Sequence, residues 1–191
     1  MNQTDFRKDI MPVLFLTIVV CIAVIALTVV DGITGEKIAE NDRQKTLEGL
    51  KEMFPEMDGF DMASDIDVFI IKIGDEVVGY AFNVTAQGYG GDIGLIVGIE
   101  NTTLAEDDII LRGISITKHS ETPALGAEIV KPYFKDQFEG LSASEVALTK
   151  DGGQIDAITG ATISSSAVSN AVHDAIIEKA ELIRTTILEV E

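Results

Sequence analysis

The first pattern along the chain is a continuous apolar run near the N-terminus. Residues 11–30, MPVLFLTIVVCIAVIALTVV, contain no charged side chain. At about 1.5 Å per helical residue, such a run spans roughly 30 Å, the thickness of the hydrocarbon core of a bilayer. It therefore predicts one transmembrane helix. The alternative is a cleaved signal peptide, but its apolar region is usually about 7–15 residues long, and no clear small-x-small cleavage site precedes Asp31.

After this run the apolar positions take first a helical and then a strand-like spacing. Residues 35–53 are charged, with apolar positions at uneven helical spacing, and predict a helix leading out of the membrane. The acidic residues 56–65 predict a loop. Two β-rich runs then flank Gly74-Asp75, which is a hairpin signal. Further β-rich runs predict strands over 95–100, 108–119 and 144–150, and residues 132–142 predict a short helical turn.

The C-terminal pattern is one apolar stripe. It predicts a helix of about 25 residues that begins near Thr162, with the stripe formed by Val168, Val172, Ile176, Ala180, Ile183 and Ile187. Consecutive strands with helices at the ends indicate an α+β domain on an antiparallel sheet. The expected organisation is a cytoplasmic tail (1–10), a transmembrane helix (11–30), a linker helix and loop (31–60) and one folded domain (61–191).

The distribution of charge predicts how the chain is oriented in the membrane and argues against some partners. Arg7 and Lys8 precede the apolar run, whereas Asp31, Glu36 and Glu40 follow it, so the tail is expected inside the cell and the domain outside the cytoplasm. The net charge of −18 makes nucleic acid an improbable partner. The chain's one cysteine lies within the apolar run, which leaves no disulfide or thiolate chemistry for the outer domain.

Residues 151–166, DGGQIDAITGATISSS, are the most informative segment for chemistry. They predict a tight turn of small residues that delivers the Thr162 hydroxyl to the start of the long helix. There the N–H groups of residues 163–165 are expected to lack intrahelical partners, which suits a phosphate. The structural alternative is that Thr162 is only an N-cap, worth about 1 kcal/mol.

A further alternative makes Thr162 a catalytic nucleophile, which requires a base within hydrogen-bond reach. His173 lies eleven residues later on the same helix, roughly 16 Å along the axis, which is too far to take the proton. His119 would have to approach through the fold. A threonine hydrolase is therefore possible but has no support from the sequence.

Residues 156–166 closely resemble the flavinylation motif of the FMN-binding domains of Rnf complexes and of sodium-pumping NADH:quinone oxidoreductases. The resemblance implies that a separate flavin transferase, using FAD as donor, esterifies the FMN phosphate to Thr162. An ester at this hydroxyl would remove the need for a neighbouring base. No catalytic residue or metal ligand is then expected.

Two other segments match the same family. His119–Gly126, HSETPALG, resembles the family's segment that packs against the isoalloxazine ring, with Ala124 where glycine is usual. Residues 87–91, QGYGG, resemble its G-x-G-G stretch. The resemblance assigns the cofactor to Thr162, Asp156, Thr159, Gly160, Ala161, Ser165, Glu121, Thr122, Leu125, Gly126, Gly90 and Gly91.

The resemblance covers nearly the whole chain and is closest to the G-type component of Rnf complexes, with the C-type component of the sodium-pumping enzyme as the alternative. It implies electron transfer by covalently bound FMN, with other membrane subunits, redox proteins and the flavin transferase as partners. Three other function classes stay open: a non-redox binding module or sensor, a threonine hydrolase, and an accessory domain that binds FMN without a covalent bond.

Overall fold

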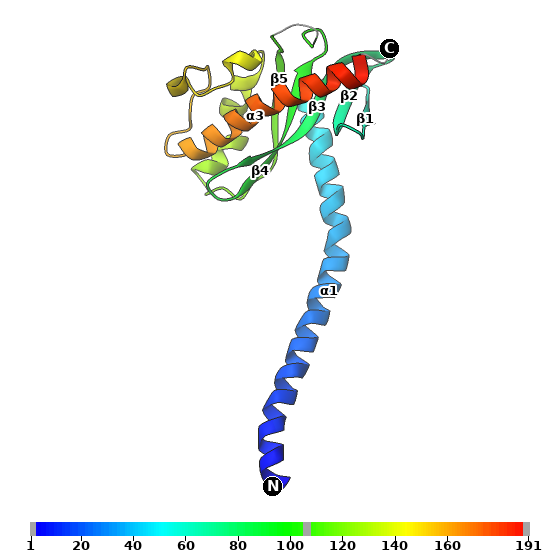
Figure 1. Ribbon diagram of the computed structural model, residues 1–191, viewed down its shortest axis with the longest axis vertical. Helices are drawn as coiled ribbons and strands as arrows, with labels where there is room; N and C mark the ends of the chain where they lie inside the picture. Colours follow the sequence, from blue (N-terminus) through cyan, green and yellow to red (C-terminus); the bar gives the residue numbers. More distant parts are fainter. Residues whose placement is uncertain (1–2, 105–107, 189–191) are drawn as a thin grey trace. The chain divides into compact units, whose positions relative to one another are not determined.

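The computed structural model describes residues 3–104 and 108–188, with the backbone alone at residues 3–10, 33, 35, 36, 39, 187 and 188. The chain forms two compact units, Met1–Gln44 and Lys45–Glu191. Helix α1 (Gln3–Met53) begins in the first unit and ends in the second. Figure 1 labels the helices and strands.

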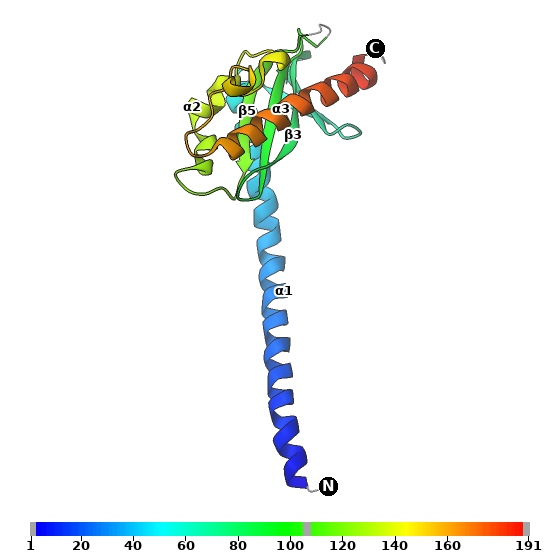
Figure 2. The same ribbon diagram turned by 60° about the vertical axis from the view of Figure 1, so that its left-hand side comes forward.

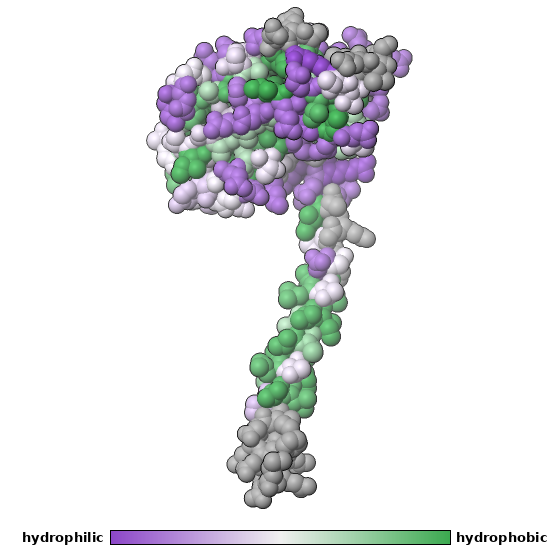
Figure 3. Space-filling model, in the orientation of Figure 1, coloured by the Kyte–Doolittle hydropathy of each residue, from purple (hydrophilic) through white to green (hydrophobic). Residues whose placement is uncertain are grey.

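The first unit contains the predicted membrane span. Met11–Gly32, 22 residues of α1, is long and apolar enough to cross a membrane, and Figure 3 shows the apolar side chains gathered along this stretch. The hydroxyls of Thr17 and Thr28 each donate to the carbonyl four residues earlier, at 2.9 Å. These polar groups are therefore satisfied within the helix, as a hydrocarbon environment requires.

The second unit is built on an antiparallel sheet in the order β1-β2-β3-β4-β5. Its strands are β1 (Gly59–Ala63), β2 (Val68–Ile73), β3 (Glu76–Gln87), β4 (Asp92–Glu100) and β5 (Leu111–Lys118). The predicted hairpin is confirmed: β2 and β3 are joined by Gly74-Asp75, and Gly74 has φ +60°. Helix α3 (Thr162–Ile183) lies across one face of the sheet in both Figure 1 and Figure 2.

The two faces of the sheet carry separate apolar clusters, because side chains alternate between the faces of each strand. The face under α3 packs against the predicted stripe: Val168, Val172, Ile176, Ala180 and Ile183 are all buried, whereas the side chain of Ile187 lies outside the described residues. On the opposite face, the end of α1 supplies Leu50, Met53 and the adjacent Phe54, which pack against Phe69, Ile71, Ala81 and Ile96. The predicted α+β class is confirmed.

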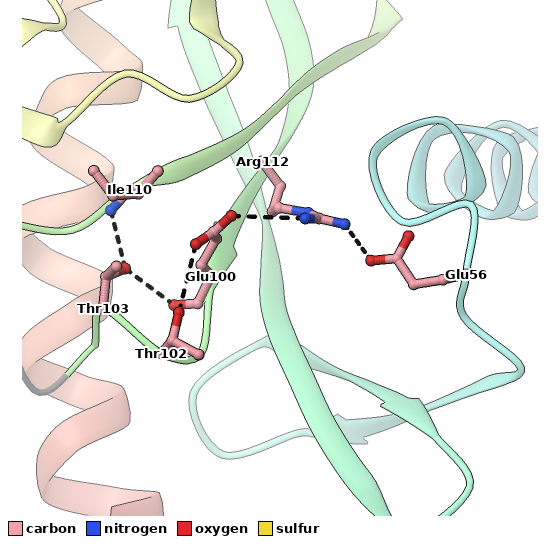
Figure 4. A network of polar contacts seen from close by, with 6 residues as sticks. All are labelled: Glu56, Glu100, Thr102, Thr103, Ile110 and Arg112. Carbon is pink, nitrogen blue, oxygen red and sulfur yellow. Dashed lines mark hydrogen bonds and ion pairs between the residues drawn. The ribbon is translucent and has the colours of Figure 1, made fainter.

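A polar network holds the chain beyond α1 to the sheet (Figure 4). Arg112 on β5 pairs with Glu56 and, at 3.6 Å, with Glu100 on β4. The same guanidinium lies 5.4 Å from the centre of the Phe54 ring. Because these side chains are about one-third exposed, their charges contribute modestly to stability. The contacts of Arg112 with Phe54 and Glu56 hold the chain just beyond the end of α1 against the sheet.

Two local predictions were wrong. Residues 56–65 were expected to be a loop, but β1 forms there by pairing with β2, and Phe60 packs edge-on against Phe69 with ring centres 5.6 Å apart. Residues 144–150 were expected to form a strand. They form 3₁₀ turns instead, Ala143–Glu145 and Thr149–Asp151, the first closed by a capping box from Ser142.

Other short helical turns lie between β5 and these two turns. They are Gly126–Val130, α2 (Pro132–Lys135) and Asp136–Phe138. The last two confirm the helical turn predicted over residues 132–142. A π-helical turn, Arg184–Leu188, continues from the C-terminal end of α3. The long C-terminal helix begins at Thr162, as the sequence predicts.

Candidate functional site

The three motif segments meet in one cavity of about 410 Å³, here called the Thr162 cavity. The turn between β3 and β4 supplies one wall residue, the loop after β5 supplies four, and the start of α3 with the preceding turn supplies five. In that order they are Tyr89; Glu121, Thr122, Leu125 and Gly126; and Gly160, Ala161, Thr162, Ile163 and Ser164. Seven of the twelve sequence-predicted residues therefore line one cavity.

The turn before α3 is held by a serine inside the helix. The Ser165 hydroxyl accepts the N–H of Ile158 at 3.0 Å and donates to the carbonyl of Ala161 at 3.0 Å. Gly160 takes φ +80°, a left-handed conformation that glycine adopts without strain. A Cβ at Gly160 would lie 3.1 Å from the Leu125 side chain, so the turn packs directly on the loop after β5. Ser165 thus shapes the turn rather than lining the cavity.

Thr162 is the first residue of α3, and its side chain is exposed. The N-cap is Ala161, which makes no side-chain capping bond. The N-cap interpretation of Thr162 was therefore wrong by one position. The Ser165 N–H donates to the Ala161 carbonyl at 3.0 Å, so the amides without an intrahelical partner are those of residues 162–164, not 163–165. Their N–H groups make this end of α3 attractive to an anion.

Glu121 lies at the point where the three segments touch. Its side chain is buried, with only 6 % of the residue exposed. One carboxylate oxygen accepts the Gly90 N–H at 2.9 Å and the other accepts the Ser164 hydroxyl at 2.7 Å. A Cβ on Gly126 would come within 2.3 Å of the second oxygen. Gly126 is therefore required by the closeness of this contact.

The loop after β5 keeps a glycine-like conformation at Ala124. This residue has φ +59°, one of two positive φ values among the described non-glycine residues. The carbonyl of Thr122 accepts the N–H groups of Leu125, at 3.2 Å, and of Ala127, at 3.1 Å. The sequence departs from the family's glycine, yet the backbone at this position stays in the left-handed region.

The turn between β3 and β4 is closed by a hydrogen bond from the Gly88 N–H to the Gly91 carbonyl at 3.0 Å. A Cβ on Gly90 would lie 2.3 Å from the Ser120 carbonyl, which explains why this turn and the loop after β5 can approach so closely. Gly91 has φ +136° and is not part of the cavity wall. Tyr89 projects from the turn with 72 % of its surface exposed.

Asp156 and Thr159 line a different surface, the Asp156 depression, together with Tyr133 and Gln137. The Gln137 side chain accepts the Asp156 N–H at 2.7 Å and donates to the Asp156 carbonyl at 3.4 Å. Reduced hydration and the neighbouring Glu128 carboxylate raise the pKa of Tyr133 above its ordinary value of 10.0. The structure therefore does not place Asp156 and Thr159 in the Thr162 cavity.

Thr162 also lines a second hollow of about 370 Å³, the Lys150 depression. Gln87, Lys150, Ser166 and Asn170 contribute its polar groups. Lys150 is exposed and pairs with Asp151 at 2.9 Å. Thr162 thus lines two hollows, one largely apolar and one with a cationic side chain.

Neither histidine of the chain lines the Thr162 cavity or the Lys150 depression. His173 Nδ1 lies 2.9 Å from the Ala143 carbonyl. His119 Nδ1 accepts the N–H of Glu121 at 3.3 Å, and the ring lines a separate groove beside β5. The geometry therefore provides no histidine base for a nucleophilic Thr162.

Sequence reasoning missed Tyr89 and Gln137 at these surfaces, and it named Ile163 and Ser164 only for their backbone N–H groups. Tyr89, Ile163 and Ser164 line the Thr162 cavity, and Gln137 holds the backbone of Asp156. Tyr89 and Ser164 stand within the quoted motifs QGYGG and TISSS, so their neighbourhood pointed to them. The sequence around Gln137 does not indicate this contact, because its partner Asp156 lies nineteen residues further along the chain.

Comparison with known proteins places the chain in a family. Residues 88–177 match the family described as FMN-binding domain. The G component of an ion-translocating oxidoreductase complex from Methanosarcina acetivorans is 39 % identical over 168 residues, which cover 82 % of this chain and 86 % of that protein. The G component of the Na⁺-translocating ferredoxin:NAD⁺ oxidoreductase complex from Acetobacterium woodii is 32 % identical over 199 residues, covering 91 % and 93 %.

Among solved structures, the C component of the Na⁺-translocating NADH-quinone reductase from Parabacteroides distasonis is 26 % identical, with a TM-score of 0.47 over 57 % of this chain and 58 % of that one. The identity and coverage shared with the two G components decide the family. The chain belongs to the family of G components of Rnf-type ion-translocating oxidoreductase complexes, and its second unit contains that family's FMN-binding domain.

Proposed function

We propose that this protein is an electron-transfer subunit of an ion-translocating membrane complex and carries one FMN joined through its phosphate to the Thr162 hydroxyl. The observation that carries the proposal is the position of Thr162. Its side chain is exposed on the first turn of a 22-residue helix, in the wall of both the Thr162 cavity and the Lys150 depression. The family's FMN-binding domain supports the choice of cofactor.

The residues around Thr162 fit both ends of FMN. The free amides of residues 162–164 and the positive end of the α3 dipole favour a phosphate, and Lys150 adds a cation on the polar side. For the ring, the Thr162 cavity offers Tyr89, Leu125 and Ile163, which are 72 %, 43 % and 58 % exposed. A flat aromatic ligand would remove this apolar surface from water.

When bound, FMN supplies acceptance and donation of electrons one at a time. The chain's own contribution is to hold and orient the group. Thr162 fixes its phosphate end, Leu125 and Ile163 limit access of water to the ring side, and Glu121 keeps the surrounding segments together. The resemblance of residues 156–166 to the family's flavinylation motif supports a separate flavin transferase as the enzyme that forms the ester.

The membrane is the second part of the proposal. The 22-residue apolar segment Met11–Gly32 supports a membrane location, and the relatives are named as subunits of ion-translocating complexes. We propose that other membrane subunits and redox proteins are the partners. Attachment to the membrane raises the effective concentration at which the flavin meets them. The Arg7 and Lys8 flank favours a cytoplasmic tail and an extracytoplasmic domain.

The bond is tested by intact mass. Full-length protein produced together with a flavin transferase should gain the mass of one FMN less one water, and it should fluoresce as a flavoprotein on a denaturing gel. Thr162→Ala should lose both signals. Thr159→Ala is the matched control, because Thr159 belongs to the same turn but lines the Asp156 depression; it should retain the full mass gain.

Three outcomes would contradict the proposal. Wild-type protein without added mass would exclude the ester, and colour that disappears on denaturation would indicate FMN held without a covalent bond. Loss of the added mass in Thr159→Ala with retention in Thr162→Ala would move the ester to the other threonine. Thr162→Ser keeps a hydroxyl at the same position and should retain part of the attachment.

A further inference from the structure

Glu121 is a buried carboxylate with an unusual set of partners. Of its two oxygens, one accepts a backbone N–H from the turn between β3 and β4, and the other accepts a hydroxyl from the first turn of α3. Its own backbone belongs to the loop after β5. None of the described lysines or arginines forms an ion pair with it. One side chain therefore joins the three segments that line the Thr162 cavity.

The contact with the Gly90 N–H requires an acceptor on the side chain of residue 121. A carboxylate is acceptor-only, and both partners, the Gly90 N–H and the Ser164 hydroxyl, donate to it. A glutamine could accept the Gly90 N–H through its amide oxygen and donate its NH₂ group to the Ser164 hydroxyl, so the Gly90 contact is lost only with a side chain that has no strong acceptor, such as methionine. The enclosing backbone gives no space for a shift, because a Cβ at Gly88 would lie 2.1 Å and one at Gly126 2.3 Å from the carboxylate oxygens.

We infer that Glu121 is the positioning residue of the flavin site: its two hydrogen bonds, called here the Glu121 clamp, assemble the Thr162 cavity before FMN is attached. The inference rests on the proposed function for the identity of the ligand, but the clamp itself is a property of the flavin-free protein. Ser164 is two residues from Thr162 on α3. The clamp thus fixes the attachment threonine relative to the wall formed by the loop after β5.

The clamp has an electrostatic consequence for the bound group. Glu121 is the one carboxylate among the residues described in the cavity wall, and it is screened little because it is buried. Adding electrons to FMN increases negative charge in the cavity, so the Glu121 carboxylate in its wall disfavours the reduced flavin. Removing this charge while keeping the side chain's size should move the reduction potential in the positive direction.

The test uses Glu121→Met, which removes the acceptor, and Glu121→Gln, which removes the charge, both in the full chain, with Glu128→Gln as the matched control. Glu128 lies in the same region of the chain and accepts the Tyr133 hydroxyl at 3.4 Å, but it lines the Asp156 depression. In protein produced without a flavin transferase, hydrogen exchange of the Gly90 amide should become about ten-fold faster or more in Glu121→Met, which has no strong acceptor, a factor equal to about 1.4 kcal/mol. In Glu128→Gln it should match wild type.

In FMN-loaded protein, confirmed by mass, the potential of Glu121→Gln should shift positively and by more than that of Glu128→Gln. Should Glu121→Met fail to fold, Ser164→Ala removes one of the two donors and keeps the carboxylate; it should still speed Gly90 exchange. Equal Gly90 exchange in all variants would overturn the clamp. Equal potentials in the two glutamine variants would overturn its electrostatic part, whereas wild type without flavin would overturn only the proposed function.

Discussion

Replacing Ser165 or Ser169 by alanine makes the same chemical change at two buried positions one turn apart on α3, and it should have opposite effects on stability. Both serines are 0 % exposed. The Ser165 hydroxyl bonds the Ile158 N–H and the Ala161 carbonyl. The Ser169 hydroxyl is the one buried side-chain polar atom without a hydrogen-bond partner among the described residues.

The magnitude for Ser165→Ala follows from the groups left behind. The Ile158 N–H loses its acceptor in a residue that is 8 % exposed, and an unsatisfied buried donor costs about 1–3 kcal/mol. The Ala161 carbonyl still accepts a hydrogen bond from the Ser165 N–H, so no second buried polar group loses its partner. Alanine's higher helix propensity returns about 0.5 kcal/mol. The expected net loss is about 0.5–2.5 kcal/mol.

Ser169→Ala should be stabilising. It breaks no hydrogen bond among the described residues, removes a buried polar group and gains the same helix propensity. The expected gain is about 0.5–2 kcal/mol. Since 1 kcal/mol moves Tm by about 2–4 °C for a chain of this length, Tm should fall by roughly 1–10 °C for Ser165→Ala and rise by roughly 1–8 °C for Ser169→Ala.

The assay is thermal unfolding of the full chain in detergent, followed by circular dichroism, together with hydrogen exchange of the Ile158 amide. Ser165→Ala should accelerate that exchange, while Ser169→Ala should leave it unchanged. Ser165→Ala should also slow FMN attachment, because the turn that presents Thr162 loses its internal support. Shifts of the same sign and size in the two variants would refute the hydrogen-bond reasoning and leave only helix propensity.

Two further predictions concern the backbone and the membrane. Ala124→Gly should stabilise the protein by up to about 1 kcal/mol, because a left-handed conformation costs an L-residue about 1–2 kcal/mol and the flexibility of glycine in the unfolded chain offsets part of the gain. Ala127→Gly, where φ is not positive, should destabilise the protein by about 0.5–1 kcal/mol. Equal Tm changes in the two variants would argue against strain at Ala124. Protease added to intact spheroplasts should digest the domain beyond residue 32, and protection until lysis would reverse the proposed orientation.

The ring-side interpretation of the loop after β5 was only partly accessible from sequence. The segment His119–Gly126 resembled a known ring-side segment, and four of its residues do line the Thr162 cavity. The role of Glu121 was not visible there, because its partners are Gly90 and Ser164, 31 and 43 residues away in the chain. Asp156 and Thr159 show the converse relation: they are close to Thr162 in sequence but line another surface.

Sequence alone determined the features that depend on local periodicity. The apolar run, the hairpin at Gly74-Asp75 and the stripe of α3 each follow from the spacing of side chains within one segment, and the structure has all three. Local composition misjudged β1, because that strand exists only through pairing with β2. It also missed the shift of the N-cap to Ala161, which depends on how the preceding turn closes.

The tertiary structure decided how the motif segments combine. It brought the turn after β3, the loop after β5 and the start of α3 around one cavity, with Glu121 as their common acceptor. It also gave the Ser165 hydroxyl a partner and left the Ser169 hydroxyl without one among the described residues. The physical reason is that hydrogen bonds and close packing depend on distances in space, whereas periodicity in the sequence reports only which face of an element is apolar.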